Sequence, residues 1–328
     1  MKILVTGATG FLGKRIAQGL LEDKSYEVFG TGRNEKNLKE LETLGVKTFK
    51  GDLDNSEFVA EIGKDIDVIV HSAALSSPWG RYEEFYTSNV ISTKNIIDSA
   101  KKNNIKRIVN ISTPSIYFDY NDRFDIKEDF LPSRFVNFYA QTKYEAEKLI
   151  LQAYKDGLET LSLRPRAIIG GGDTTIMPRI LKAQNEGKLK IIGTGNNIVD
   201  VSSVANVVSA VILSINANKD ALGQNYNITN GKPIKLWDLI EKVLNKLDLK
   251  MSRQKIPFEV GYGIAKLLET KAKFSKDYKE PVLTCYGIGI LAKSMTMNID
   301  KAKKLLGYIP HQTTDETIDE FINWWKQK

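Results

Sequence analysis

The fold of this chain is decided by its first stretch, Met1-Lys-Ile-Leu-Val-Thr-Gly7-Ala-Thr-Gly10-Phe-Leu-Gly13. Residues 2–6 are an apolar, β-branched run that predicts a short buried strand, and residues 14–21 have helical spacing. Glycines between a strand and a helix let the backbone turn tightly and approach a pyrophosphate, while the helix N-terminus offers free N–H groups to the anion. The stretch therefore predicts a dinucleotide-binding turn.

The end of the next predicted strand, residues 26–31, indicates which dinucleotide binds. An NAD site usually carries an acidic residue about 20 positions beyond the glycine turn, where it binds the ribose 2′-hydroxyl. This chain has Arg33 there, with Lys36 about one helical turn further on. A guanidinium suits a 2′-phosphate, so we expect NADP(H) to be preferred and NAD(H) to be the alternative; a solvent-facing arginine is the competing interpretation.

The rest of the chain alternates strand and helix patterns. Strands are predicted at 2–6, 26–31, 46–50, 66–71, 105–111, 158–163 and 224–228, and the longer helices at 83–103, 137–155 and 200–215. This alternation predicts an α/β fold, a Rossmann-like doubly wound parallel sheet of about seven strands with a smaller α/β C-terminal substrate lobe.

The predicted domain boundaries follow from the same pattern. We expect a dinucleotide-binding domain over 1–164, continued by about 200–228, and a substrate-binding lobe built from 165–199 and 229–328. Pro165 is expected to break the sixth strand, and Gly170-Gly171-Gly172 to begin the crossing into the lobe. Two amphipathic helices are predicted within the lobe, at 236–247 and 260–268.

Polar groups suited to catalysis follow the fifth strand and lie on the next helix. Ser112 and Thr113 stand at the carboxyl end of that strand, where ligands of such sheets bind. Tyr139 and Lys143 are four residues apart, which places them on one helix face. A fixed ammonium favours phenolate, so this spacing predicts a tyrosine pKa lowered toward the range of an acid/base catalyst.

Other strand ends predict contacts to the rest of the dinucleotide. Asp52, after the third strand, suits a hydrogen bond to the adenine amino group, and Leu53 is placed to pack on the ring. Ala73 and Ala74, after the fourth strand, are small enough for the chain to pass close beneath the nicotinamide half.

Composition excludes several classes of protein. With 42% hydrophobic and 27% charged residues the chain is ordinary for a folded globular protein. No apolar run approaches the roughly 18 residues of a membrane span, and the first strand begins too early to leave room for a signal peptide. The single cysteine, Cys285, excludes an internal disulfide, and two distant histidines make a metal site unexpected. We therefore expect a cytoplasmic protein.

The net charge of +7 is concentrated late in the chain. Residues 232–304 hold 16 Lys and Arg against 8 Asp and Glu. This excess of positive charge has two interpretations. It is either an ordinary solvated surface or a region that attracts an anionic substrate or a membrane surface. No recognition motif accompanies the charge, so nucleic acid is not an expected partner.

Together these residues carry a family resemblance over nearly the whole chain. The glycine turn, Asp52-Leu53, Asn89-Val90, Ser112-Thr113 with Tyr117, Tyr139-Ala-Gln-Thr-Lys143 and Leu163-Arg-Pro resemble an extended short-chain dehydrogenase/reductase, of the NAD-dependent epimerase/dehydratase superfamily. The segments 163–201 and 226–234 are similar to the 3β-hydroxysteroid dehydrogenase-like branch. Residues 74–81 are similar to bacterial members that reduce 2-alkyl-3-oxoalkanoates.

The resemblance implies a role for each matching position. Tyr139 would be the general acid/base, Lys143 would bind the nicotinamide ribose and tune Tyr139, and Asn89 would help to organise the site. The catalytic hydroxyl falls on Thr113, four residues before Tyr117, with Ser112 beside it, and which of the two acts is open. The expected cofactor-binding set is Gly7, Thr9, Gly10, Phe11, Leu12, Gly13, Arg33, Asp52, Leu53, Ala73, Ala74, Asn89, Tyr139 and Lys143. The branch often has Gly-Pro where this chain has Gly170-Gly171.

The expected reaction is hydride transfer between nicotinamide and a carbonyl or alcohol carbon of a hydrophobic small molecule, 3β-hydroxysteroid-like or 3-oxoalkanoate-like. The apolar positions of the late helix, Phe258, Val260, Tyr262, Ile264, Leu267 and Leu268, either line its pocket or pack between lobes. The alternatives are a nucleotide-sugar epimerase/dehydratase with tightly bound NAD and a cofactor-sensing protein without turnover. Peripheral membrane contact and a homodimer are both compatible with the sequence.

Overall fold

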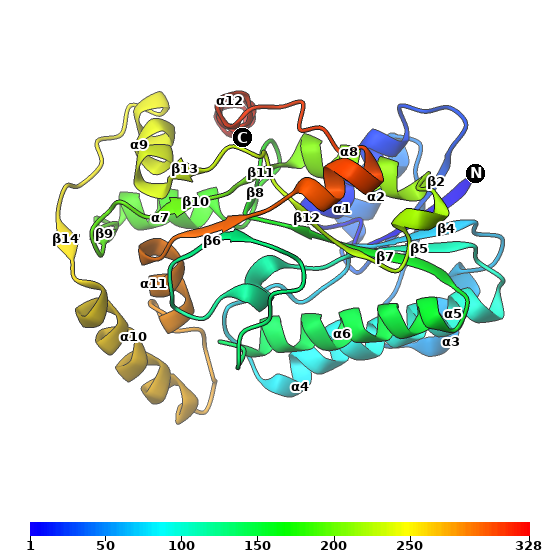
Figure 1. The fold of residues 1–328 in the computed structure, drawn as a ribbon, viewed down its shortest axis with the longest axis horizontal. Helices are drawn as coiled ribbons and strands as arrows, with labels where there is room; N and C mark the ends of the chain where they lie inside the picture. Colours follow the sequence, from blue (N-terminus) through cyan, green and yellow to red (C-terminus); the bar gives the residue numbers. More distant parts are fainter.

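A seven-stranded parallel sheet forms the centre of the protein, and the computed structural model describes all 328 residues around it (Figure 1). The strands lie in the order β12 (Asn225–Ile228), β7 (Glu159–Pro165), β5 (Arg107–Ile111), β4 (Val68–His71), β1 (Lys2–Thr6), β2 (Glu27–Gly32) and β3 (Lys47–Lys50). Every neighbouring pair is parallel. The predicted doubly wound sheet is confirmed, and its order reverses between β1 and β4, where such sheets bind ligands.

Helices cover both faces of this sheet. The layer of α1 (Phe11–Leu20), α2 (Glu35–Thr43) and α8 (Val204–Ile215) lies above it in Figure 1, and α3 (Ser56–Ile62), α5 (Ser92–Lys102) and α6 (Phe138–Lys155) lie below. Ile3 and Val5 pack into the first apolar layer and Leu4 into the second. Because both faces are buried, the strand reads as a continuous apolar run rather than an alternating one.

Tertiary burial decides the boundaries of α8, a helix rich in valine. Eight of its twelve residues are buried against the sheet, and this packing outweighs the weak helix propensity of β-branched side chains. The predicted helix at 200–215 begins only at Val204, because Ser202–Ser203 form β11, which pairs with β8 (Ile168–Ile169). The Ser203 side chain then caps the helix by accepting from the N–H of Ala205.

Two further predictions are corrected by the structure. The continuous helix expected over 83–103 is α4 (Tyr82–Phe85), a π-helical segment η1 (Tyr86–Ile91) and α5. The sixth strand does not end at Leu163 but continues through Pro165, which pairs with Ile228 of β12. Pairing of β7 with β5 stops at Leu163, so the missing N–H of Pro165 interrupts no ladder on that side.

Some of the remaining elements build a separate apolar cluster beside the sheet, whereas others pack in a smaller cluster or against the seven-stranded sheet itself. The remaining elements are β6 (Arg123–Ile126), α7 (Met177–Asn185), β9 (Ile191–Ile192), β10 (Ile198–Val199), β13 (Ile234–Lys235), α9 (Leu236–Lys246), β14 (Lys255–Ile256), α10 (Phe258–Lys273), α11 (Cys285–Ala292), β15 (Met295–Met297) and α12 (Thr314–Lys326), with the short helical turns η2 (Pro114–Tyr117), η3 (Lys219–Ala221) and η4 (Ala302–Leu306). A four-stranded sheet, β13-β10-β15-β6, runs through them.

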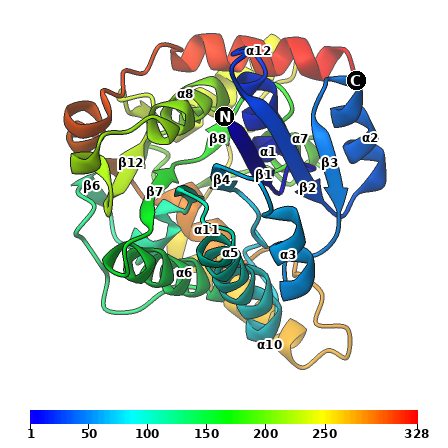
Figure 2. The same ribbon diagram turned by 90° about the vertical axis from the view of Figure 1, so that its right-hand side faces the viewer.

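The C-terminal segment crosses between the two clusters. Ile299 and Tyr308 pack against the seven-stranded sheet, whereas Ile318 and Phe321 of α12 pack with α7 and α9. Figure 2 shows α12 along one edge of the molecule and α10 at the opposite edge. Neither α11 nor α12 is among the predicted helices, although α12 carries a capping box formed by Thr313 and Glu316.

Candidate active site

The glycine turn joins β1 to α1 and leaves the first turn of the helix open. Gly10 is the N-cap, and no side chain caps the helix, so N–H groups there are available to an anion. Gly7 has φ +65°, and a Cβ on it would lie 2.8 Å from Cα of Ala73. A Cβ on Gly13 would lie 2.2 Å from the Gly7 carbonyl oxygen. Only glycine fits these two positions, and the turn fits a dinucleotide pyrophosphate.

The residues that the sequence predicts for the adenosine end of the cofactor follow β2 and β3. Arg33 Nη1 lies 3.2 Å from Asp52 Oδ2, and 75% and 47% of the two side chains are exposed. The structure thus brings both predicted residues together at the surface. Asn37, which the sequence reasoning missed, donates from Nδ2 to the Thr9 carbonyl at 2.8 Å and holds the glycine turn to α2. Leu53 is buried in the core under α5.

Asn89 organises the loop that follows β4. Its Oδ1 accepts from the N–H of Leu75 at 2.8 Å, and its Nδ2 donates to Thr142 Oγ1 at 3.0 Å. The π-helical turn places this buried amide between the loop and α6, and such turns are frequent at functional sites. Asn89 therefore connects the 73–76 loop to the helix that carries Tyr139 and Lys143.

A buried histidine, His71, also helps to hold the 73–76 loop in place. His71 Nδ1 lies 2.9 Å from Thr6 Oγ1, and Nε2 lies 3.0 Å from Thr93 Oγ1. Thr93 donates to the Asn89 carbonyl, and Thr6 accepts from the N–H of Ala73. These partners assign the proton to Nε2. Burial lowers the pKa of His71 to about 3, so this histidine is a neutral structural link and not an acid/base group.

The predicted catalytic side chains meet above the carboxyl end of β5. Tyr139 is half-buried, and the hydroxyls of Thr113 and Ser76 face its phenol. Lys143, one turn along α6, is buried and donates from Nζ to the carbonyl of Ile111 at 2.7 Å. Ser76 is a site residue that the sequence reasoning missed.

Electrostatics at this pair differ from the sequence prediction. The pKa of Tyr139 is raised, because burial outweighs the opposing effect of the Thr113 and Ser76 hydroxyls. Lys143 does not lower it, since its ammonium is directed at the Ile111 carbonyl instead. Burial also lowers the pKa of Lys143 to about 8, against the opposing charge of Glu147. The expected lowering of the tyrosine pKa by its neighbour is therefore not seen.

The two candidate hydroxyls after β5 have different surroundings. Thr113 donates from Oγ1 to Ser115 Oγ at 3.0 Å, whereas the buried Oγ of Ser112 has no hydrogen-bond partner. Ser115 in turn lies 2.7 Å from the hydroxyl of Tyr286 on α11. Tyr286 thus reaches the site from a helix that was not predicted, and no local pattern around it indicates this role.

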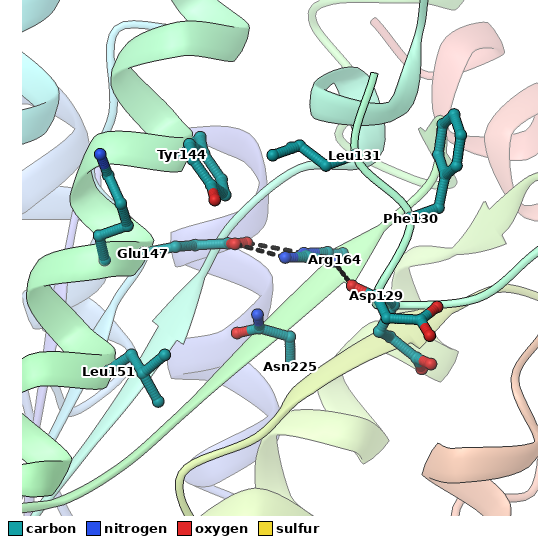
Figure 3. Close-up of a pocket in the computed structure, with 10 residues that line it drawn as sticks. Asp129, Phe130, Leu131, Tyr144, Glu147, Leu151, Arg164 and Asn225 are labelled. Atoms are coloured by element: carbon teal, nitrogen blue, oxygen red, sulfur yellow. Dashed lines mark hydrogen bonds and ion pairs between the residues drawn. The ribbon is translucent and has the colours of Figure 1, made fainter. Parts of the chain in front are cut away.

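Behind the active site, a buried ion pair fastens α6 to β7. Glu147 accepts from Arg164 at 2.8 Å and 2.5 Å, and 3% of each side chain is exposed. The pair lines a pocket of about 210 Å³, shown in Figure 3. The pocket contains none of the predicted site residues. Because Glu147 and Lys143 lie on one face of α6, the pair positions the catalytic side of the helix.

The apolar residues predicted on the late helix divide between two environments. Phe258 and Tyr262 of α10 pack against the C-terminal cluster, whereas Val260, Ile264 and Leu267 are 52%, 44% and 74% exposed. No helix in the protein combines the length and the apolar content that crossing a membrane requires.

This arrangement defines the class of protein. A glycine turn opens a doubly wound sheet, and a Tyr–Lys pair stands beside a strand-end hydroxyl, as in an extended short-chain dehydrogenase/reductase, which is an NAD(P)-dependent oxidoreductase. Residues 4–259 match the 3-beta hydroxysteroid dehydrogenase/isomerase family, and the chain belongs to that family. The predicted superfamily and branch are confirmed.

Characterised relatives and solved structures are similar over nearly the full chain. The 2-alkyl-3-oxoalkanoate reductase of Stenotrophomonas maltophilia is 31% identical over 97% of this chain and 97% of that protein. The mouse sterol-4-alpha-carboxylate 3-dehydrogenase, decarboxylating, is 30% identical over 98% and 90%. The UDP-glucuronic acid 4-epimerase of Bacillus cereus, solved with NAD, shares the fold with a TM-score of 0.79, at 23% identity over 100% of this chain and 99% of that one.

Proposed function

We propose that this protein interconverts a hydrophobic ketone and the corresponding secondary alcohol, with NADP(H) as the preferred cofactor. The observation that carries the proposal is the meeting of Tyr139, Thr113 and Lys143 at the strand end beyond the glycine turn. These residues supply a proton donor, a hydrogen-bonding hydroxyl and a fixed cation, which together suit acid/base chemistry at an oxygen.

Bound NADP(H) supplies or accepts the hydride. In the reducing direction Tyr139 donates its phenolic proton to the substrate oxygen, and its raised pKa keeps that proton in place at neutral pH. Thr113, or Ser112 with its unpartnered hydroxyl, hydrogen-bonds the same oxygen. Lys143 holds the nicotinamide ribose, and Asn89 keeps the 73–76 loop against α6.

The names of two relatives support the substrate class. One acts on 2-alkyl-3-oxoalkanoates and the other on sterol 4α-carboxylates at carbon 3. Both substrates are largely hydrocarbon, and both react at a carbon next to the one that bears a carboxylate. The UDP-sugar enzymes resemble this chain in fold alone.

The exposed end of α10 and the loop that follows it support delivery of such a substrate from a lipid surface. Leu267, Phe274 and Val282 are 74%, 88% and 77% exposed. Five lysines, at positions 266, 271, 273, 276 and 279, outnumber the three acidic residues of this segment, at positions 269, 277 and 280. Apolar side chains surrounded by cations are typical of peripheral contact with anionic lipid.

We expect activity to increase with the length of the substrate chain. Each buried methylene stabilises the complex by about 0.8 kcal/mol, so kcat/KM should rise steadily along a series of 3-oxo esters and 3-oxo acids, measured by NADPH consumption. UDP-glucose and UDP-galactose serve as the comparison, because their binding depends on the diphosphate. Activity that is flat along the series, with efficient turnover of a UDP-sugar and tightly retained NAD, would establish the epimerase instead.

We also expect Arg33 to select NADP(H). Replacing it by alanine should weaken NADPH binding by about 1.5–3 kcal/mol, the contribution of a charge-assisted hydrogen bond, and leave NADH binding little changed. Its pair with Asp52 is exposed, so folding should not suffer. Calorimetric titration with both cofactors measures the effect, and Lys39→Ala, another exposed cation of this region, is the matched control. Equal losses for NADPH and NADH would show that Arg33 does not contact the phosphate.

A further inference from the structure

Arg166 is a buried residue whose guanidinium makes no direct ion pair. Only 7% of the residue is exposed, its Nε has no hydrogen-bond partner, and its side chain takes part in no ion pair. Arg164, two residues earlier, shows the contrast, because its guanidinium binds Glu147 with two hydrogen bonds and also donates to the Glu128 carbonyl.

The backbone of Arg166 is firmly held at the substrate end of the sheet. The residue directly follows β7, whose carboxyl end lies beside that of β5. Its N–H donates to the Ile228 carbonyl at 3.2 Å and to Ser202 Oγ at 3.0 Å. Arg166 therefore stands at the edge where the catalytic hydroxyls also lie.

Burial lowers the pKa of Arg166, whereas the phenol of Tyr286 and the carboxyl of Asp200 oppose this effect and favour the charged guanidinium. Asp200 forms no ion pair with it, and its Oδ2 accepts from the N–H of Met297 at 2.7 Å. Tyr286 lies 2.7 Å from Ser115, which accepts from Thr113 at 3.0 Å. Tyr286 also contributes to the raised pKa of Tyr139. A single phenol thus connects the surroundings of Arg166 with those of the acid/base residue.

Burying a cation that makes no direct ion pair is unfavourable, because the group loses its hydration and gains no hydrogen-bonded partner in return. Such a group beside an active site is a candidate for ligand binding, since the ligand can bring the missing charge. A guanidinium presents a planar set of N–H donors that matches a carboxylate with two parallel hydrogen bonds.

We propose that Arg166 binds a carboxylate of the substrate, so that the substrate is a 3-hydroxy or 3-oxo acid rather than a neutral ketone, ester or sterol. This assignment rests on the proposed function and deepens it. Because Arg166 follows β7 at the edge of the sheet where Thr113 follows β5, a carboxylate bound there would lie near the carbon that reacts. The hydrocarbon part of the substrate then extends away from the guanidinium.

The test compares a long-chain 3-hydroxy acid with its methyl ester, oxidised with NADP⁺ by wild type and by Arg166→Met. The ester has the same chain and the same reacting carbon but no charge. Losing the charge-assisted hydrogen bonds should lower kcat/KM for the acid by roughly 10- to 100-fold, with the ester within about threefold of wild type. Arg166→Lys should restore part of the preference for the acid, because it keeps the charge without the planar geometry.

Two further measurements separate binding from structure. Arg253→Met is the matched control, an exposed arginine paired with Glu241, and should leave the ratio of acid to ester unchanged. The melting temperature of Arg166→Met should stay near that of wild type, because the guanidinium makes no direct ion pair and the Asp200 carboxyl keeps its hydrogen bond from the N–H of Met297.

The outcomes distinguish this proposal from the proposed function. Equal effects of Arg166→Met on acid and ester, or none on either, would overturn the assignment while leaving the oxidoreductase in place. If wild type oxidises neither compound, the proposed function fails, and the binding of the saturated fatty acid and its primary amide is measured by thermal shift. Selective binding of the acid that Arg166→Met abolishes would still support the anchor, and equal binding of acid and amide would overturn it.

Discussion

Replacing Tyr139 by phenylalanine should lower kcat by about 10²–10⁴-fold, the usual contribution of a positioned general acid or base. Cofactor affinity should stay near the wild-type value, because the substitution removes only the hydroxyl. Lys143→Ala should lower both kcat and cofactor affinity, since the ammonium is expected to bind the ribose and also donates to the Ile111 carbonyl beside the site. Steady-state kinetics with the 3-oxo series and titration with NADPH measure the two effects.

Tyr144→Phe is the matched control for this experiment. It changes the next residue of α6, whose ring lines the pocket of the Glu147–Arg164 pair and not the catalytic cluster (Figure 3). Its activity should remain near wild type. If Tyr139→Phe retained more than about a tenth of the activity, the phenol would not be the proton donor.

The raised pKa of Tyr139 adds a pH dependence to the same prediction. At neutral pH the phenol is protonated, which suits reduction, whereas oxidation needs the phenolate to accept the proton of the alcohol. The rate of alcohol oxidation should therefore increase as the pH is raised from neutrality toward the pKa of the phenol. The residual oxidation by Tyr139→Phe should lack this increase.

Breaking the pair of Glu147 and Arg164 should have the largest effect on stability. Removing one partner, as in Arg164→Met, leaves the other charge buried without compensation and should reduce the free energy of unfolding by about 3–5 kcal/mol. Both side chains are almost fully buried, so solvent does not screen the remaining charge. Denaturant unfolding of the purified protein measures the loss.

The double variant Glu147→Leu with Arg164→Met separates this explanation from a loss of packing. It should recover most of the stability, because no unpaired charge remains. Lys101→Met, which breaks an exposed pair with Asp156, is the control and should change stability by only about 0–1 kcal/mol. A loss below about 1 kcal/mol in Arg164→Met would show that the pair is not the main link between α6 and β7.

The glycine turn and the Tyr–Lys pair could be read from the sequence because each is a local feature. The strand, the turn and the helix of the dinucleotide cradle are contiguous within the first residues. Likewise, Tyr139 and Lys143 lie one helical turn apart, so their spacing alone places them on one face. The seven strands and their parallel direction also follow from local patterns, since alternating strands and helices favour a doubly wound sheet.

Other elements have a local sequence pattern, but whether that pattern forms a helix, and of which kind, depends on tertiary packing. Thr313 and Glu316 form a capping box that could have indicated α12. The β-branched stretch of α8 is a helix because the sheet buries it. The sequence places Asn89 on a helix, but only the structure shows that this helix widens into a π-turn around it.

Tertiary structure alone decided the electrostatics and the completion of the site. Ser115 and Tyr286 are 171 residues apart in sequence, and no local pattern around either residue predicts their contact. Arg166 and Arg164 are neighbours of the same type, yet one is paired and the other is not. The pKa of Tyr139 is raised rather than lowered, because desolvation depends on the distant segments that pack around the phenol. The sequence by itself therefore determines the groups whose chemistry depends on spacing along the chain. Burial and the presence of counter-charges depend on segments that come together only in the folded protein.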